Sequence, residues 1–395
     1  MRLPVRRLRA LVRPLRSVSG LGWAVLGLGA VLSGAGWWLG WLELLVVGLG
    51  LLGMAALAVA LTLGRSTYDV DLEVVDRRVT VGQRVTGRVE VRSRARRRLL
   101  PARIELPVGR QVAEFPLPWL RPGARHEELF SIPTTRRSVV QVGPVRSVRG
   151  DPWGLIARRV AWTGTVEVCV HPVLVPLTGA AAGVLRDLEG RPTRVVSNSD
   201  LSFHALRDYE PGDDRRHIHW KTTARTGTLM VRQFEDTRRT HTAVALATCA
   251  ADYRDEDELE LAVAAAASIG VSALREDRSL TFLAGSRLRT HEAGALLDDV
   301  ARVTTSPGGR AATALVPWIS SDAPDASVVV LITGSVPELP VLRAAAERLR
   351  GGAPTLLLTC RSGDTTEVTA RGSLAVARLG ALEDLPLLLR RVVGT

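Results

Sequence analysis

The chain has 395 residues, and its composition already excludes several classes of protein. With 46% apolar and 23% charged residues, it is not a disordered chain, a collagen or a coiled-coil rod. Its 3 cysteines are too few for a disulfide scaffold or a cysteine-rich zinc module. The net charge of +12 keeps a nucleic-acid partner open until the charge is located along the chain.

The N-terminal region combines a basic arm with two long apolar stretches. Residues 1–20 contain six arginines and no acid, and Glu43 is the only charged residue from position 21 to position 64. Leu21–Leu42 and Leu44–Gly64 each have about the 20 residues that cross a hydrocarbon core ~30 Å thick. Tryptophans at the ends of these stretches are typical of the two membrane interfaces.

We therefore predict a transmembrane helical hairpin over residues 21–65, in the plasma (inner) membrane. The positive-inside rule places the arginine arm in the cytoplasm, and two crossings return the rest of the chain there. One alternative is a secretory signal peptide, but that needs only about 7–15 apolar residues before its cleavage site. The other is a buried pair of core helices.

Residues 66–171 show the pattern of short β-strands. Val85–Arg92 alternates apolar and polar residues with period 2, as a half-buried strand does. Similar runs separated by turn residues lie at Tyr68–Val75, Arg103–Val108, Glu127–Ile132 and Val139–Val148. This spacing predicts a β-sandwich of the immunoglobulin-like kind.

A connector rich in Pro and Gly over residues 172–200 leads to an α/β part in the region 201–395. The expected strands are Thr242–Thr248, Ser279–Ala284, Ser327–Thr333, Pro354–Thr359 and a weaker Leu374–Leu379. The expected helices are Glu256–Leu274, His291–Val303, Pro337–Leu349 and Leu382–Val392. Apolar strands alternating with helices predict a mostly parallel sheet covered on both faces.

One dense motif occupies residues 206–227. Its five cations are offset by four acids, so the segment is nearly neutral, which predicts an ion-pair network. The cations are Arg207, Arg215, Arg216, Lys221 and Arg225, and the acids are Asp208, Glu210, Asp213 and Asp214. Polar residues alternate with Ile218 and Trp220, which permits a strand there. Lys221 is the only lysine of the chain, which suggests a slot that a guanidinium does not fit.

This motif resembles a family of bacterial membrane-associated proteins known as the domain of unknown function 58. The matching residues are Arg207, Tyr209, Pro211, Gly212, Asp213, Arg215, Ile218, Trp220, Lys221, Ala224 and Arg225. Asp151–Leu155 and the pair His171-Pro172 also agree, and the resemblance covers roughly residues 20–395. It implies a C-terminal von Willebrand factor A-like domain and a role beside MoxR-type AAA+ ATPases in assembling or activating other proteins.

A von Willebrand A-like domain would hold Mg²⁺ after its first strand with the spacing Asp-x-Ser-x-Ser. Here the corresponding stretch is Ala247-Thr248-Cys249, and a second expected aspartate is replaced by Gly334 or Ser335. A methyl group and a soft thiol do not replace hard oxygen ligands. We predict that this degenerate position holds no metal and that the protein has no cofactor, although Asp252 lies nearby in sequence.

The sequence favours a membrane-anchored scaffold that binds the bilayer and a protein partner such as a MoxR-type AAA+ ATPase, without catalytic residues. The motif is then either a staple at a domain junction or a docking surface. One alternative is an envelope hydrolase that uses Asp208 and Asp213. Both have arginines nearby in sequence, and pairing with an arginine lowers the pKa of a carboxyl group, which is the wrong direction for a general acid. A nucleic-acid binder is the second alternative, although topology explains half of the excess charge and no nucleic-acid motif is present. The sequence leaves the oligomeric state open.

Overall fold

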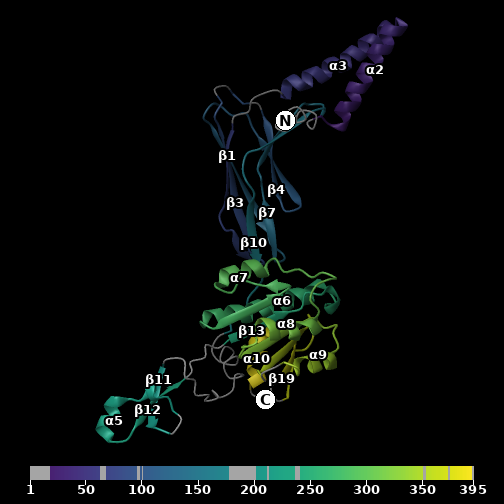
Figure 1. Cartoon of the computed structure of the whole chain (residues 1–395). Coiled ribbons are helices and arrows are strands. Elements are labelled where there is room, and N and C mark those ends of the chain that lie inside the picture. The colour runs from purple at the N-terminus through teal and green to yellow at the C-terminus, as the bar shows by residue number, and fades with distance from the viewer. Residues whose placement is uncertain are drawn as a thin grey trace, which may run out of the picture. The chain divides into compact units, whose positions relative to one another are not determined.

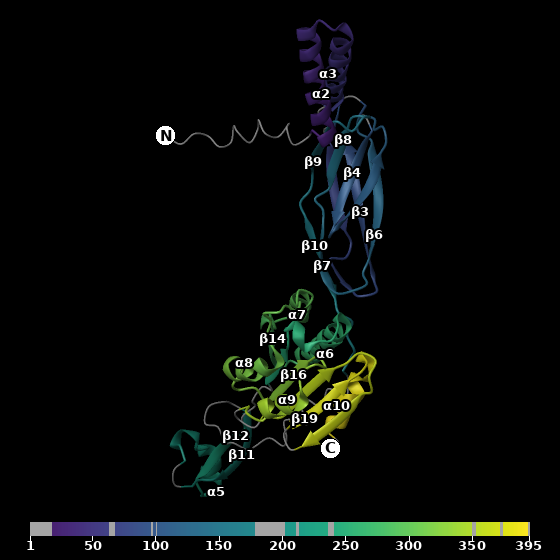
Figure 2. The same ribbon diagram turned by 90° about the vertical axis from the view of Figure 1, so that its right-hand side faces the viewer.

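The computed structural model describes residues 18–62, 68–95, 98–99, 101–177, 202–210, 213–235, 241–349, 353–371 and 374–393 (Figures 1 and 2). The chain divides into two compact units, Met1–Val170 and His171–Thr395. Most of the predicted basic arm, most of the predicted connector, and Pro211 and Gly212 of the motif lie outside the described residues.

The first unit begins with the two predicted apolar helices, which are confirmed. Helices α2 (Gly20–Leu39) and α3 (Leu42–Thr62) are both long and apolar enough to cross a membrane. They pack on each other at small residues, where Gly29 of α2 lies against Gly48 and Leu52 of α3 and Gly36 lies against Leu45. A Cβ at Gly36 would lie 2.6 Å from the backbone N of Leu45, so the two backbones approach as closely as glycine allows.

Two antiparallel sheets follow in the same unit. The first contains β1 (Tyr68–Val74), β3 (Arg84–Ser93) and β6 (Arg125–Pro133). The second contains β2 (Arg78–Thr80), β10 (Val166–His171), β7 (Ser138–Val142), β4 (Ala102–Val108), β8 (Arg146–Gly150) and β9 (Ala157–Ala161), with β5 (Gln111–Leu117) paired to β4. Val89 and Val91 of the first sheet share one buried core with Leu106 and Val142 of the second, so the sheets pack face to face.

The predicted run Val139–Val148 is wrong as a single strand. It forms the end of β7 and the start of β8, separated at Gly143 and Pro144. Proline has no N–H for a strand ladder, and Gly143 has a positive φ of 92°. The sequence prediction also missed β2, β5, β9 and β10.

The loop between β8 and β9 joins the sandwich to the helical hairpin. The Asp151 carboxylate accepts hydrogen bonds from the backbone N–H groups of Trp153 at 3.0 Å, Leu155 at 3.2 Å and Ile156 at 2.6 Å. The carbonyl of Leu155 then accepts the N–H of Ser19 at 2.8 Å, and Ser19 caps α2. Asp151–Leu155, one of the pieces that carries the family resemblance, is therefore a structural joint.

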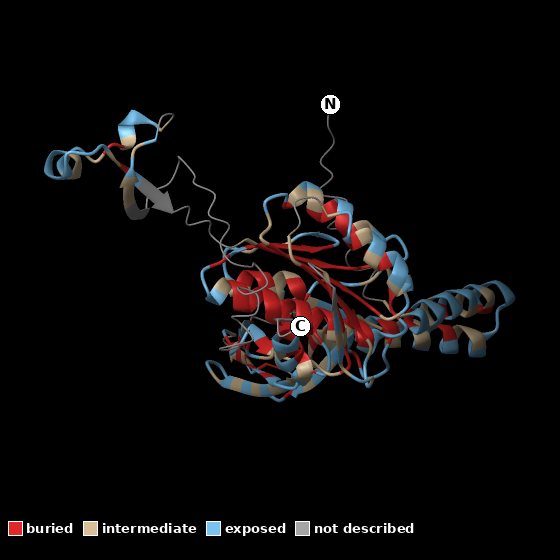
Figure 3. Ribbon diagram, turned by 90° about the horizontal axis from the view of Figure 1, so that it is seen from below, coloured by how far each residue is buried: buried red, intermediate tan, exposed pale blue. Residues whose placement is uncertain are grey.

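The second unit contains a seven-stranded sheet in the order β15-β14-β13-β16-β17-β19-β18. β13 (His241–Leu246), β14 (Ser279–Ala284), β16 (Val328–Thr333), β17 (Thr355–Cys360) and β19 (Leu374–Leu379) are parallel, while β15 (Ser286–Arg287) and β18 (Glu367–Arg371) are antiparallel edges. Every residue of β16 and β17 is buried, which requires cover on both faces (Figure 3). The prediction of a mostly parallel sheet is confirmed.

Helices fill the connections of this sheet. The long α6 (Glu256–Arg275) packs on β13, β14, β16 and β17, and its buried face is rich in alanine, which permits close approach. The other helices are α7 (Ala293–Val300), α8 (Leu315–Asp322), α9 (Leu339–Ala346) and α10 (Leu385–Val393). Helix α8 was missed by the sequence prediction.

We expect Asp151→Ala to lower the melting temperature of the detergent-solubilised full chain, because it leaves three backbone N–H groups unpaired. The cost of such a loss is about 1–3 kcal/mol. Burial alone would raise the pKa of Asp151, but the three N–H groups outweigh it and hold the pKa below its usual value. The contribution is therefore present above about pH 4 and is lost as the pH falls through the lower, folded-state value. A melting curve of Asp151→Ala that matches the parent chain at neutral pH would contradict this role.

Candidate functional site

The family motif folds as a small hairpin with a short helix. β11 (Ser202–Asp208) pairs antiparallel with β12 (Met230–Glu235), and a 3₁₀ turn (Arg215–His217) and α5 (Trp220–Thr226) lie between them. The predicted strand around Ile218 and Trp220 is therefore wrong. Ile218 makes a single bridge to Val231, and His219 then caps α5 by accepting the N–H of Thr222 at its Nδ1, which starts a helix instead.

A bidentate ion pair closes the loop of this module. The guanidinium of Arg207 donates to both carboxylate oxygens of Asp213, at 2.8 and 2.6 Å. The same carboxylate accepts the N–H of Glu210 at 2.9 Å. The hydrogen bond from Arg207, followed by that from Glu210, lowers the pKa of Asp213. The predicted ion pairing of the motif is thus present at Arg207 and Asp213, and it is a structural clasp.

The other motif side chains lie on the surface. Trp220, Lys221, Ala224 and Arg225 are exposed neighbours along α5, at positions i, i+1, i+4 and i+5, and Trp220 is 65% exposed. We call these four residues the α5 strip. Arg215 and Arg216 just before it are exposed as well, while Tyr209 is half-buried. Lys221 occupies no slot, so the inference from its being the only lysine is wrong.

The threonines of α5 explain which of its faces is free. Thr223 accepts the N–H of Met230 with its hydroxyl at 3.1 Å and so turns one side of the helix toward β12. Thr222 bonds the ring of His219 at 2.7 Å. These contacts hold the helix in place without any side chain of the α5 strip.

The second candidate region is the carboxyl edge of the parallel sheet, where the strand order reverses between β13 and β16. The predicted degenerate metal position lies at this edge, directly after β13. The Ala247 carbonyl accepts the Tyr253 hydroxyl at 2.7 Å, and the Thr248 hydroxyl accepts the Arg310 N–H at 3.0 Å. Cys249 is half-buried.

Asp252 is buried near these residues but is already bonded within the chain. Its Oδ2 accepts the N–H of Ala312 at 2.8 Å, and burial, only partly opposed by that bond, raises its pKa. A Cβ at Gly334 would collide with the backbone of Asp252, which is why no aspartate fits at position 334. No cluster of three or more His, Cys, Asp or Glu side chains suited to a metal occurs among the described residues.

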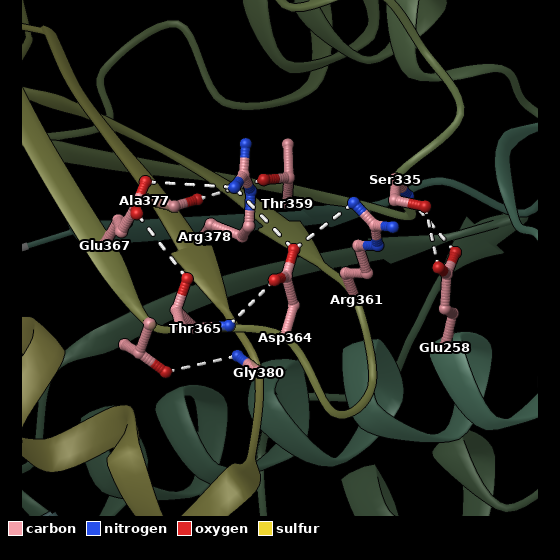
Figure 4. Close-up of polar contacts among 11 residues, drawn as sticks. Glu258, Ser335, Thr359, Arg361, Asp364, Thr365, Glu367, Ala377, Arg378 and Gly380 are labelled. Carbon is pink, nitrogen blue, oxygen red and sulfur yellow. Dashed lines mark hydrogen bonds and ion pairs between the residues drawn. The ribbon is translucent and has the colours of Figure 1, made fainter.

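The sequence analysis missed the role of Glu258, which lies in the first turn of α6. Glu258 is 1% exposed, and its carboxylate accepts the hydroxyl and N–H of Ser335, at 2.7 and 3.2 Å (Figure 4). It also accepts the N–H of Arg254 at 3.0 Å. This carboxylate fastens α6 to the end of β16 and fills part of the edge where a ligand would otherwise bind.

An arginine-lined pocket lies beside it. A space of about 140 Å³ opens at the carboxyl ends of β17 and β19 and the first turns of α9, and its lining includes Arg343, Arg361 and Arg378. Arg361 and Arg378 are directed at Asp364, at 3.3 and 3.7 Å (Figure 4). Arg378 also pairs with Glu367, which lines the pocket as well, so the charges of these two guanidinium groups are already matched within the chain.

Together these features define a chain with an apolar helical hairpin, an antiparallel sandwich and a doubly wound α/β part that carries an exposed motif module. A sequence profile of the family described as "Protein of unknown function DUF58" matches residues 205–291, which include most of this module, α6 and β14. This match supports the family resemblance over that part of the chain. No curated protein matches it.

Solved structures resemble only parts of the chain. The CARDB domain of the PF1109 protein from Pyrococcus furiosus is 13% identical with a TM-score of 0.21, and the match covers 27% of this chain and 93% of that domain. The alkylpurine DNA glycosylase AlkC from Pseudomonas fluorescens is 14% identical with a TM-score of 0.22, over 29% of this chain and 33% of that chain. Scores this low carry no argument about function.

We expect Asp213→Asn to loosen the motif module, because the amide cannot form the charge-assisted pair with Arg207. Backbone amide exchange around Glu210 should become faster, as measured by hydrogen exchange with mass spectrometry on the full chain. Asp208→Asn, a change at an exposed carboxylate at the end of β11, is the matched control. Equal exchange in Asp213→Asn and the parent chain would show that the clasp does not hold the loop.

We also expect Mg²⁺ to leave the melting temperature of the full chain unchanged relative to EDTA. The groups after β13 offer no carboxylate at position 247, and their oxygens are bonded to Tyr253 and Arg310. A specific stabilisation by Mg²⁺ that disappears in Asp252→Asn would overturn this prediction and place a residual site at Asp252.

Proposed function

We propose that this protein is a membrane-anchored cytosolic adaptor that docks a protein partner through the α5 strip. The observation that carries the proposal is the exposure of Trp220, Lys221 and Arg225, which belong to the motif by which the family is recognised. The fold of the module uses the clasp and the threonines instead. An exposed aromatic residue flanked by cations is typical of a binding surface, where Trp and Arg supply much of the affinity. This favours the docking surface over the junction staple.

The anchor in this proposal is the helical hairpin. Its two helices are largely exposed in the chain itself, because only 17% of the most apolar stretch of each helix is buried. Lipid is therefore the natural cover for their apolar side chains. The arginines of the N-terminal arm favour a cytoplasmic N-terminus in the inner membrane, and the hairpin then returns the sandwich to the same side.

The finer fold assignments are part of the same proposal. The sheet order, with a reversal between β13 and β16, supports a von Willebrand factor A-like reading of the α/β part. The face-to-face antiparallel sheets support an immunoglobulin-like reading of the sandwich. Because the carboxyl edge is filled by Thr248, Glu258 and their partners, docking in this proposal does not depend on Mg²⁺.

The partner we propose is a MoxR-type AAA+ ATPase, as the family resemblance implies, with a role in the assembly or activation of other proteins. An ATPase that remodels other proteins needs a fixed adaptor, and the anchored chain would supply one at the inner leaflet.

A hydrolase is a weaker proposal for this chain. Asp213, the carboxylate it would use, accepts two hydrogen bonds from Arg207, and its lowered pKa is the wrong direction for a general acid. A nucleic-acid binder would need a contiguous basic surface, whereas the exposed cations of the module alternate with the exposed acids Asp208, Glu210 and Asp214.

We expect Trp220→Ala combined with Lys221→Ala to lower the affinity for the purified MoxR-type ATPase at least tenfold while leaving the melting temperature unchanged. Loss of a central interface tryptophan typically costs about 2 kcal/mol or more, which is more than tenfold in affinity. Leu229→Ala, a change at an exposed apolar residue of the same module outside α5, is the control. The measurement is binding of the ATPase to full chain reconstituted in nanodiscs. Equal affinity of the double variant and the parent chain, or a lowered melting temperature, would contradict the docking role.

A further inference from the structure

The end of the sandwich that meets the helical hairpin is fixed close to the start of α2. Ser19 donates its hydroxyl to the carbonyl of Gly154 at 2.7 Å and its N–H to the carbonyl of Leu155 at 2.8 Å. Val18 also forms an antiparallel bridge with Ile156. A Cβ at Gly22 would collide with the Leu155 carbonyl, so the loop touches the first turn of the helix directly.

Three loops of the sandwich lie at this same end. Leu99 and Leu120 exchange backbone hydrogen bonds, which brings the segment after β3 beside the segment after β5. The register between β4 and β8 pairs Arg103 with Val148, which places the start of β4 next to the loop 151–156. In Figure 2 this end of β8 and β9 is the one beside α2.

Two exposed tryptophans lie on these loops. Trp119, directly before Leu120, is 62% exposed, and Trp153, between Asp151 and Gly154, is 42% exposed. Tryptophan favours the headgroup level of a bilayer, where its ring is partly apolar and its N–H remains hydrated. Trp23, one turn into α2, marks the same level for the hairpin.

The charge at this end is positive. Arg98, Arg121 and Arg158 are exposed, and among the described residues none of them has an acidic partner. The acids nearby are already used: Asp69 pairs with Arg94, Glu90 pairs with Arg125, and Asp151 binds backbone N–H groups. Anionic lipids of the cytoplasmic leaflet attract arginines held close to the membrane surface.

We propose that Trp119, Trp153, Arg98, Arg121 and Arg158 form a membrane-facing end of the sandwich that binds the headgroups of anionic phospholipids. The inference rests on the proposed anchoring of the hairpin and adds a second, lipid-selective contact to it. The Ser19 joint and this contact together hold the sandwich against the inner leaflet and limit its swing about the hairpin.

The test uses full chain in nanodiscs with a fluorophore on a single introduced cysteine. Cys169 and Cys360 are buried, so Cys249→Ser gives a background with little other labelling. Trp119→Cys carries the probe at the membrane-facing end. Arg110→Cys carries it at the β4–β5 turn, at the opposite end of the same strand pair, about 20 Å away for strands that rise roughly 3.3 Å per residue. Quenching is measured with lipids that bear a nitroxide on the headgroup.

We expect several-fold stronger quenching at position 119 than at position 110, and a further increase when phosphatidylglycerol replaces part of the phosphatidylcholine. The triple variant Arg98→Glu, Arg121→Glu and Arg158→Glu should lose that increase, because each arginine contributes on the order of fivefold to the bound equilibrium. The control variant has three charge reversals at the other end, Arg77→Glu, Arg84→Glu and Arg110→Glu. With the probe at position 119, this control should still show the increase in quenching with phosphatidylglycerol.

Equal quenching at positions 119 and 110 in every lipid mixture, with the chain present in the nanodisc, would overturn this inference and leave the anchoring intact. A chain that does not enter nanodiscs and stays dispersed without detergent would overturn the anchoring and this inference together.

Discussion

The joint between the start of α2 and the loop 151–156 is the constraint on which the architecture of the first unit depends. It uses a buried carboxylate, Asp151, to organise three backbone N–H groups, and this frees the Leu155 carbonyl for Ser19. A flexible linker would leave the sandwich independent of the hairpin. The hydrogen bonds at Ser19 instead couple the position of the apolar helix α2 to the β-sheets, and Gly22 is the residue that allows the close approach.

The family motif divides into residues that build the module and residues that the module displays. Arg207 and Asp213 form the clasp, and His219, Thr222 and Thr223 set the helix. The α5 strip contributes to neither task. Because burying a large aromatic side chain is favourable, an exposed tryptophan on a short, well-fixed helix is better explained by recognition than by folding.

In the α/β part, polar side chains of the chain itself occupy the carboxyl edge of the parallel sheet. Glu258 bonds Ser335, Thr248 bonds Arg310, and Asp252 bonds Ala312, so the polar groups that face a ligand in other doubly wound sheets are satisfied internally here.

The sequence by itself determined the two apolar helices, the β region and the parallel sheet, because hydrophobic length and periodicity report directly on burial. It also located the motif at residues 206–227. It did not determine that Trp220 begins a helix, because alternation around Ile218 fits a strand equally well until the His219 cap is placed. Only the tertiary structure decided that Glu258 fastens Ser335 and that Asp151 organises the hairpin joint. Hydrogen bonds between residues 77 and 136 positions apart leave no local signal in a sequence.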